Sequence, residues 1–125
     1  MLIGIGLDLV ETARVERALA RFGERFVQKL MDPAESSTLP RQGEDRARAL
    51  ALAVAGKEAA SKALGTGWSQ GVRWRDVVVS LGPAPSLRLD GRAAEVAREL
   101  GSSGRTHARL ERRGPLVVGE VWLLS

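Results

Sequence analysis

Apolar and polar positions change their spacing several times along the chain, and each change marks an expected element. Residues 2–7 form a largely apolar run that predicts a short buried strand ending at Asp8, whereas apolar positions in residues 12–22 recur at helical spacing. Residues 45–64 are rich in alanine, the best helix former, and end at Gly65, a frequent helix stop. The first half of the chain therefore predicts one strand followed by helices.

The second half is dominated by strand patterns. A short helical stretch (25–31) and a loop (36–44) precede the long helix. After that helix the expected elements are strands at 74–81 and 87–89, a helix at 93–100, and strands at 108–111 and 116–124. This order lacks a regular strand–helix–strand alternation, so it predicts an α+β fold in which helices pack on an antiparallel sheet. A chain of 125 residues suits one compact domain over residues 1–125.

Charge and composition narrow the kinds of partner. The chain has 19 Lys and Arg against 15 Asp and Glu, and this excess, mostly arginine, favours an anionic partner. Aromatic residues make up only 4%, too few for a base-stacking platform, which argues against nucleic acid. No apolar run approaches the roughly 20 residues that span a bilayer. Absence of cysteine and of a signal-peptide pattern excludes disulfides and leads us to expect a cytoplasmic protein.

Candidate chemistry centres on Glu58 and Lys62, which are four residues apart and share one ridge of the predicted long helix. Taken alone, this pair is an ordinary surface ion pair worth about 0.2–0.5 kcal/mol. Small residues around it would let a ligand or another chain approach closely, and the turn 65–67 could offer N–H groups to a phosphate. Asp8 supplies a second carboxylate, and the two carboxylates with the Lys62 ammonium group could hold Mg²⁺ and a pyrophosphate.

Two motifs resemble the signatures of the holo-acyl-carrier-protein synthases. Residues 5–11, IGLDLVE, followed by Arg14, are similar to the amino-terminal signature of that family, and residues 57–67, KEAASKALGTG, are similar to its second signature. The resemblance covers essentially the whole chain. It implies a 4′-phosphopantetheinyl transferase fold and the transfer of 4′-phosphopantetheine from coenzyme A to a serine of an apo acyl carrier protein. The second product would be adenosine 3′,5′-bisphosphate.

The resemblance also implies roles for individual residues. Asp8 and Glu58 would bind Mg²⁺, and Glu58 would help to remove the proton of the incoming serine, directly or through a metal-bound water. Lys62 would neutralise charge that grows on the phosphate oxygens. It further implies that Arg14 contacts the acidic carrier protein, and Arg17 and Arg21 extend the same face. Candidate contacts for coenzyme A are Lys62, the backbone N–H groups of Gly65, Thr66 and Gly67, and, from its charge and position alone, Arg112.

The sequence departs from the family pattern at three places. Residues 53–54 are Ala-Val where the family usually has Arg-Phe, residues 83–85 are Pro-Ala-Pro where it has Gly-Lys-Pro, and Glu111-Arg112 stands in place of Ser-His. These departures keep a second hypothesis open: a catalytically weak homologue that binds carrier protein or coenzyme A without efficient turnover. The resemblance further implies a homotrimer with active sites between subunits. It leaves open whether the carrier serves fatty-acid or polyketide synthesis.

Overall fold

The computed structural model describes residues 1–125, and strands form the two ends of the chain. The first half contains β1 (Leu2–Glu11), α1 (Thr12–Phe22), α2 (Glu24–Leu30), α3 (Pro33–Ser36) and α4 (Gly43–Ala63). The second half contains the 3₁₀ turn η1 (Trp74–Asp76), β2 (Val77–Ser80), β3 (Ser86–Leu89), α5 (Gly91–Glu99), β4 (Thr106–Arg113) and β5 (Leu116–Leu124). No helix is both long enough and apolar enough to cross a bilayer.

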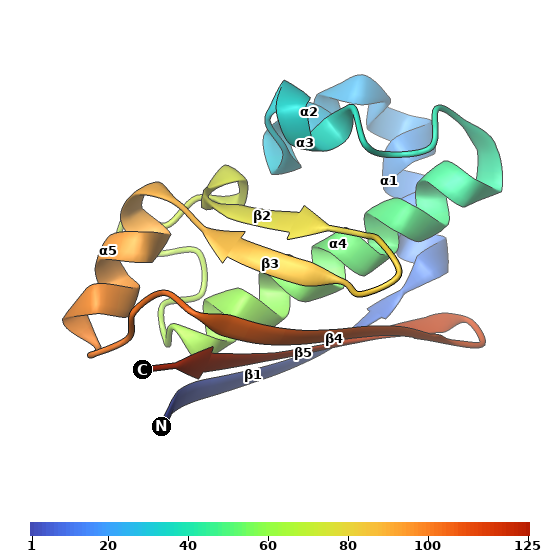
Figure 1. Ribbon diagram of the computed structural model, residues 1–125. Helices are drawn as coiled ribbons and strands as arrows, with labels where there is room; N and C mark the ends of the chain where they lie inside the picture. The colour runs from blue at the N-terminus through green and yellow to red at the C-terminus, as the bar shows by residue number, and fades with distance from the viewer.

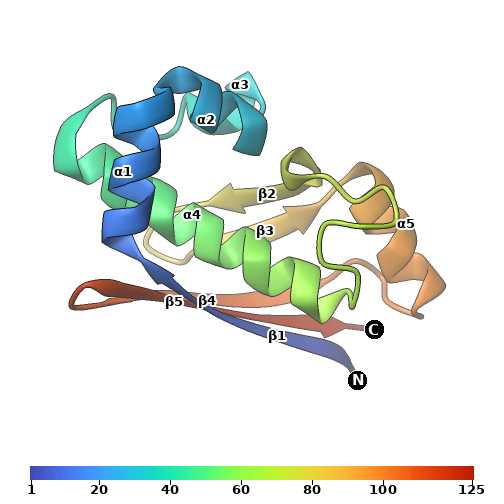
Figure 2. The same cartoon turned by 180° about the vertical axis from the view of Figure 1, so that it is seen from behind.

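Two antiparallel sheets and the long helix α4 organise the fold, which confirms the predicted α+β class. One sheet has the strand order β1-β5-β4 and the other is the β2–β3 hairpin. Figure 1 shows α4 lying along the three-stranded sheet, with the hairpin beside it. Seen from behind in Figure 2, α1 and α2 stand at one end of α4 and α5 at the other. The helix α4 is therefore the element that all other parts surround.

Close packing of α4 on the three-stranded sheet depends on glycines. A Cβ atom at Gly6 would lie 1.7 Å from the carbonyl oxygen of Ala59, so only glycine allows this approach. Gly4 and Gly119 approach the carbonyl oxygens of Ala63 and Ala55 in the same way. The small residues of α4 therefore face the protein's own sheet. The expectation that they admit a ligand or another chain is wrong for this side of the helix.

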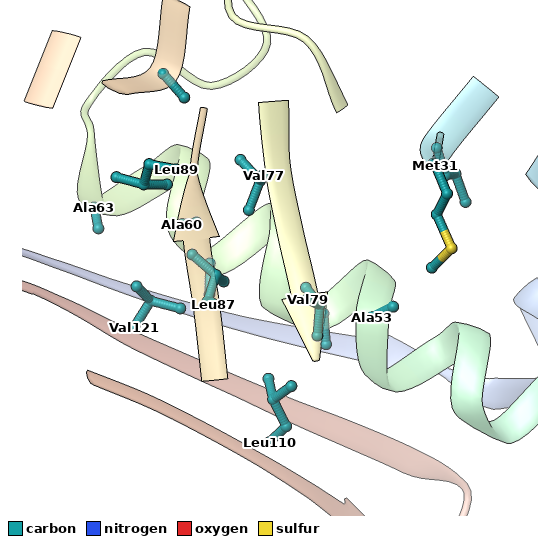
Figure 3. Packing of buried hydrophobic residues seen from close by; sticks show 14 of the residues in the cluster. Met31, Ala53, Ala60, Ala63, Val77, Val79, Leu87, Leu89, Leu110 and Val121 are labelled. Carbon is teal, nitrogen blue, oxygen red and sulfur yellow. The ribbon is translucent and has the colours of Figure 1, made fainter. Parts of the chain in front are cut away.

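Apolar side chains from both sheets meet α4 in a single buried cluster. Figure 3 shows the inward residues of the hairpin, Val79 and Leu87, lying between α4 and the strands that carry Leu110 and Val121. Ala53 of α4 is also fully buried and belongs to this cluster. The alternating burial of the strands explains why the period-2 pattern predicted them.

Three local expectations are wrong, each for a tertiary reason. The strand β1 does not end at Asp8, because β5 pairs with it as far as Glu11 opposite Leu116. Residues 74–76 form a 3₁₀ turn instead of a strand, because the Asp76 carboxylate accepts a hydrogen bond from the Arg73 N–H at 3.0 Å. The helical apolar spacing of residues 12–22 predicts that Phe22 is buried, but Phe22 is 52% exposed and lines a cleft.

Candidate active site

A cleft of about 760 Å³ opens between β1, α1, α2 and α4. Most of its wall is apolar, with Val54 of α4, Phe26 of α2 and Trp74 of η1 among the lining residues. One part of the wall is charged and combines Asp8, Arg14, Glu58 and Lys62. The cleft therefore offers a charged region for phosphates or a cation beside a larger apolar surface.

Asp8 and Lys62 are in direct contact in the charged region. The Lys62 ammonium donates to Asp8 Oδ1 at 2.7 Å and to the Leu7 carbonyl oxygen at 3.2 Å. The hydrogen bond to Asp8 raises the pKa of Lys62, so the ammonium stays charged. The Asp8 side chain is 17% exposed and Lys62 is 51% exposed, so the lysine projects from the pair toward solvent. The structure thus brings the acid of the first strand and the ridge of the long helix together.

Glu58 lies one helical turn before Lys62 but does not pair with it. Its carboxylate accepts a hydrogen bond at Oε2 from the indole N–H of Trp68, at 3.3 Å. Burial raises the pKa of Glu58; the negative charge of Asp8 adds to this, whereas the Trp68 hydrogen bond, Lys62 and Arg14 act in the opposite direction. A carboxylate whose ionised form is disfavoured gains from the arrival of a cation or a proton.

The donor set suits a cation that is shared with a phosphate ligand. No cluster of three or more His, Asp or Glu side chains could form an all-protein metal cage. Asp8 and Glu58 line the same cleft, and the charge of Asp8 acts on Glu58. Mg²⁺ characteristically takes one or two protein carboxylates and completes its shell with substrate phosphates and water. The two carboxylates therefore fit Mg²⁺ bound together with a pyrophosphate.

The predicted basic residues of α1 are only partly in the cleft. Arg14 lines it, whereas Arg17 and Arg21 are exposed on α1 without contributing to its wall. The guanidinium of Arg21 lies 5.1 Å from the ring centre of Phe22. Sequence reasoning missed two further cations that line the cleft, Arg25 and Lys29 of α2. The sequence shows that they follow Arg21 at four-residue spacing, but it does not predict the bend between α1 and α2 that turns them toward the cleft.

Of the predicted coenzyme A contacts, Lys62 lines the cleft and the other four residues do not. The N–H groups of Gly65 and Gly67 donate to the carbonyl oxygens of Lys62 (3.0 Å) and Ser61 (3.2 Å), so they close the end of α4. The Thr66 hydroxyl donates to the Gly67 carbonyl oxygen at 2.8 Å. Arg112 is exposed on β4 and donates to the Gly114 carbonyl oxygen at 3.3 Å. Contacts of these residues with coenzyme A stay predictions.

Two tryptophans, Trp68 and Trp74, border the charged region. Their rings stack with centres 4.0 Å apart and planes 21° from parallel. Trp74 lines the cleft, and Trp68 reaches Glu58. The sequence signal for Trp68 was its place directly after the turn that ends the second signature, but nothing in the pattern showed which way its N–H points.

Comparisons with known proteins agree with one another. Residues 4–112 match the family model described as the 4′-phosphopantetheinyl transferase superfamily. The chain is 47% identical over 121 residues to a holo-[acyl-carrier-protein] synthase of Methylobacterium sp. (strain 4-46), covering 93% of this chain and 89% of that protein. It is 46% identical to one from Anaeromyxobacter dehalogenans (strain 2CP-C), over 98% and 96% of the two chains.

Solved structures show the same likeness. The holo-[acyl-carrier-protein] synthase of Neisseria meningitidis superimposes with a TM-score of 0.86 at 28% identity, covering all of both chains. The Helicobacter pylori protein of that name, solved in complex with coenzyme A, gives a TM-score of 0.78 at 26% identity over 95% of this chain and 98% of that one. The architecture described above is therefore shared from end to end.

Proposed function

Since the chain belongs to the 4′-phosphopantetheinyl transferase superfamily and is an enzyme of the holo-[acyl-carrier-protein] synthase type, we propose that it transfers 4′-phosphopantetheine from coenzyme A to a serine of an apo acyl carrier protein. The products would be the holo carrier and adenosine 3′,5′-bisphosphate, and residues 1–125 would act as one domain. The observation that carries this proposal is the meeting of Asp8, Glu58 and Lys62 at the charged region of the cleft.

In the proposed reaction the serine oxygen forms a bond to the phosphorus that carries the pantetheine arm. The bond from that phosphorus to the bridging oxygen breaks, and adenosine 3′,5′-bisphosphate leaves with the electron pair. Glu58 accepts the serine proton. Burial raises the pKa of Glu58, which makes its carboxylate a stronger base than an exposed one.

Charge neutralisation is the task of the remaining groups. Lys62 is held by Asp8 and the Leu7 carbonyl, so its ammonium is positioned before the substrate arrives. Arg14 adds a guanidinium to the same region. Asp8 and Glu58 are the residues that would hold Mg²⁺, which supplies positive charge next to the pyrophosphate when it is bound. Positioning and electrostatics are the main contributions in phosphoryl transfer.

The carrier protein would dock on the exposed basic face of α1. Arg14, Arg17 and Arg21 are exposed there, and Arg14 is also part of the cleft wall. An acidic partner on this face would place its serine near Glu58. Charges at the rim of an interface mainly accelerate encounter and make it dependent on salt.

A homotrimer is the proposed assembly, and the outer face of the three-stranded sheet supports it. Ile5, Leu7 and Leu9 are alternate residues of β1, and Trp122 lies opposite Ile5 on β5. These four side chains are 40–62% exposed and form an apolar surface on the side of the sheet away from α4. Neighbouring copies would cover this surface, and Arg112 of one copy would complete the coenzyme A site of the next.

A mass-shift assay tests the proposed function. The protein is incubated with coenzyme A, Mg²⁺ and an apo acyl carrier protein, and the carrier is then weighed by mass spectrometry. Gain of one 4′-phosphopantetheine group per carrier is the expected result, and the Glu58→Gln variant should show this gain about 10²–10⁴-fold more slowly. Binding of coenzyme A or carrier by the native chain without any mass gain would instead establish the weak homologue suggested by the departures at residues 53–54.

A further inference from the structure

We propose that Trp68 is a positioning residue for the transfer reaction: its indole N–H holds Oε2 of Glu58 and leaves Oε1 to face the reacting groups. The starting observation is that this 3.3 Å bond is the only hydrogen bond made by the Glu58 side chain. The inference rests on the proposed function, because it assigns the residue that orients its base.

The indole is held by Trp74, which is itself anchored to a buried lysine. Its ring stacks on Trp74 at 4.0 Å, and the backbone oxygen of Trp74 accepts a hydrogen bond from the Lys57 ammonium at 3.1 Å. Lys57 is fully buried and directly precedes Glu58 on α4. It also contacts the Glu35 carboxylate at 3.0 Å and the Val77 carbonyl oxygen. The backbone of Glu58 and the indole that holds its side chain are thus anchored to the same buried contact.

The chemistry of the partner suits a positioning role. An indole N–H is a donor only, so it can neither take a proton from Glu58 nor compete for one. A carboxylate has two oxygens with about four acceptor sites, so engaging Oε2 leaves Oε1 available. Lys62, the nearest cation on the same ridge, is already paired with Asp8. Without Trp68, no hydrogen bond would orient the Glu58 side chain.

The first test needs no substrate. The chain contains three tryptophans, so a ¹⁵N–¹H spectrum shows three indole N–H signals, which the Trp68→Phe, Trp74→Phe and Trp122→Phe variants assign. Glu58→Ala removes the acceptor and should shift the Trp68 signal, whereas the Trp122 signal should not move. An unchanged Trp68 signal in Glu58→Ala would overturn the proposal. This arm keeps Trp68 intact, so it remains decisive even if Trp68→Phe folds poorly.

The second test separates positioning from folding and from substrate binding. Trp68→Phe keeps an aromatic ring on Trp74 but removes the donor. We expect kcat to fall about tenfold while the KM for coenzyme A stays within about twofold, since such supporting groups typically contribute 10–100-fold. In a Glu58→Gln background the same substitution should cost nothing further, because the base it positions has been removed.

Two outcomes of the kinetic arm would contradict the proposal: an effect on KM alone, or equal losses in both backgrounds. Leu100→Ala is the control, because Leu100 is exposed at the end of α5 and does not line the cleft, and this variant should retain the native kcat. Lack of transfer by the native chain would refute the proposed function instead, and the spectral test would still decide whether Trp68 holds Glu58.

Discussion

Replacing Gly6 by alanine should separate the catalytic elements, because this glycine lets β1 lie directly against α4. An added Cβ would lie 1.7 Å from the Ala59 carbonyl oxygen and 2.8 Å from the Ala63 nitrogen. A carbon–oxygen contact needs about 3.3 Å, so strand and helix must move apart by about 1.6 Å. Both neighbours are backbone atoms, so no side chain can move aside to make room.

The displacement has an energetic and a catalytic consequence. Overpacking of a core typically costs about 1–3 kcal/mol, and we expect a loss at or above the upper end, about 3 kcal/mol, because helix backbone must shift. Asp8 is carried on the same strand, so its 2.7 Å contact with Lys62 should open beyond hydrogen-bonding distance. Transfer activity should therefore fall further than the folded fraction does.

Urea unfolding gives the change in the free energy of unfolding, and the mass-shift assay gives the transfer rate of the folded fraction. Gly82→Ala is the matched control, because its Cβ would meet nothing within 4 Å and its φ is not positive. That control should be neutral or stabilising by about 0.4–1 kcal/mol. If Gly6→Ala is as stable and as active as Gly82→Ala, the close approach of β1 to α4 does not position the site.

Three further predictions concern polar groups that are buried or half-buried. Lys57→Met leaves the buried Glu35 carboxylate without its cation and should lower the free energy of unfolding in urea by about 3–5 kcal/mol. Adding Glu35→Gln, which keeps an acceptor for the Val79 N–H, should recover most of this loss. If the losses of the two single variants simply add in the double variant, the two residues are not coupled. Thr12→Val removes a buried hydroxyl that has no hydrogen-bond partner, so it should be neutral or stabilising by about 1 kcal/mol, and a clear loss in the same assay would show a partner. Folding raises the pKa of Glu58 above its ordinary value of 4.5, so ionisation of this group lowers the free energy of unfolding. This loss of stability is absent below the unfolded pKa and is complete once the pH has risen through the folded pKa. In magnesium-free buffer, Glu58→Gln should therefore unfold at a Tm no lower than that of the native chain at pH 7, with any advantage vanishing at pH 4; a lower Tm at pH 7 would refute this.

Local patterns were sufficient to predict the helices and strands but not their exact ends. The periods of residues 12–22 and 116–124 identify α1 and β5, because burial on one side leaves a regular signal. The additional residues of β1 are specified by pairing with β5, more than 100 positions away, which no short window contains. More than half of the 21 residues of α4 are buried. Its polar positions therefore do not mark one solvent-exposed face, and the sequence pattern does not show which side of the helix borders the cleft.

The candidate site was predictable as residue types but not as contacts. Asp8 and Lys62 are separated by 54 positions, and the resemblance to a family, not the spacing, suggested that they meet. The hydrogen bond from Trp68 to Glu58 depends on the path of the loop after α4, which local propensity does not determine. Ala53 stands where the family usually carries arginine, and it is buried in the core, which the sequence pattern alone did not show.

The strand order β1-β5-β4 also dictates when this enzyme can first become competent during its synthesis. The strand that carries Asp8 has only one pairing partner in the sheet, and the residues of that partner are synthesised more than 100 positions later. Until then β1 has no ladder to join, and its alternating apolar residues remain unpaired. A nascent chain therefore cannot pair the strand that carries Asp8 until residues 116–124 have left the ribosome.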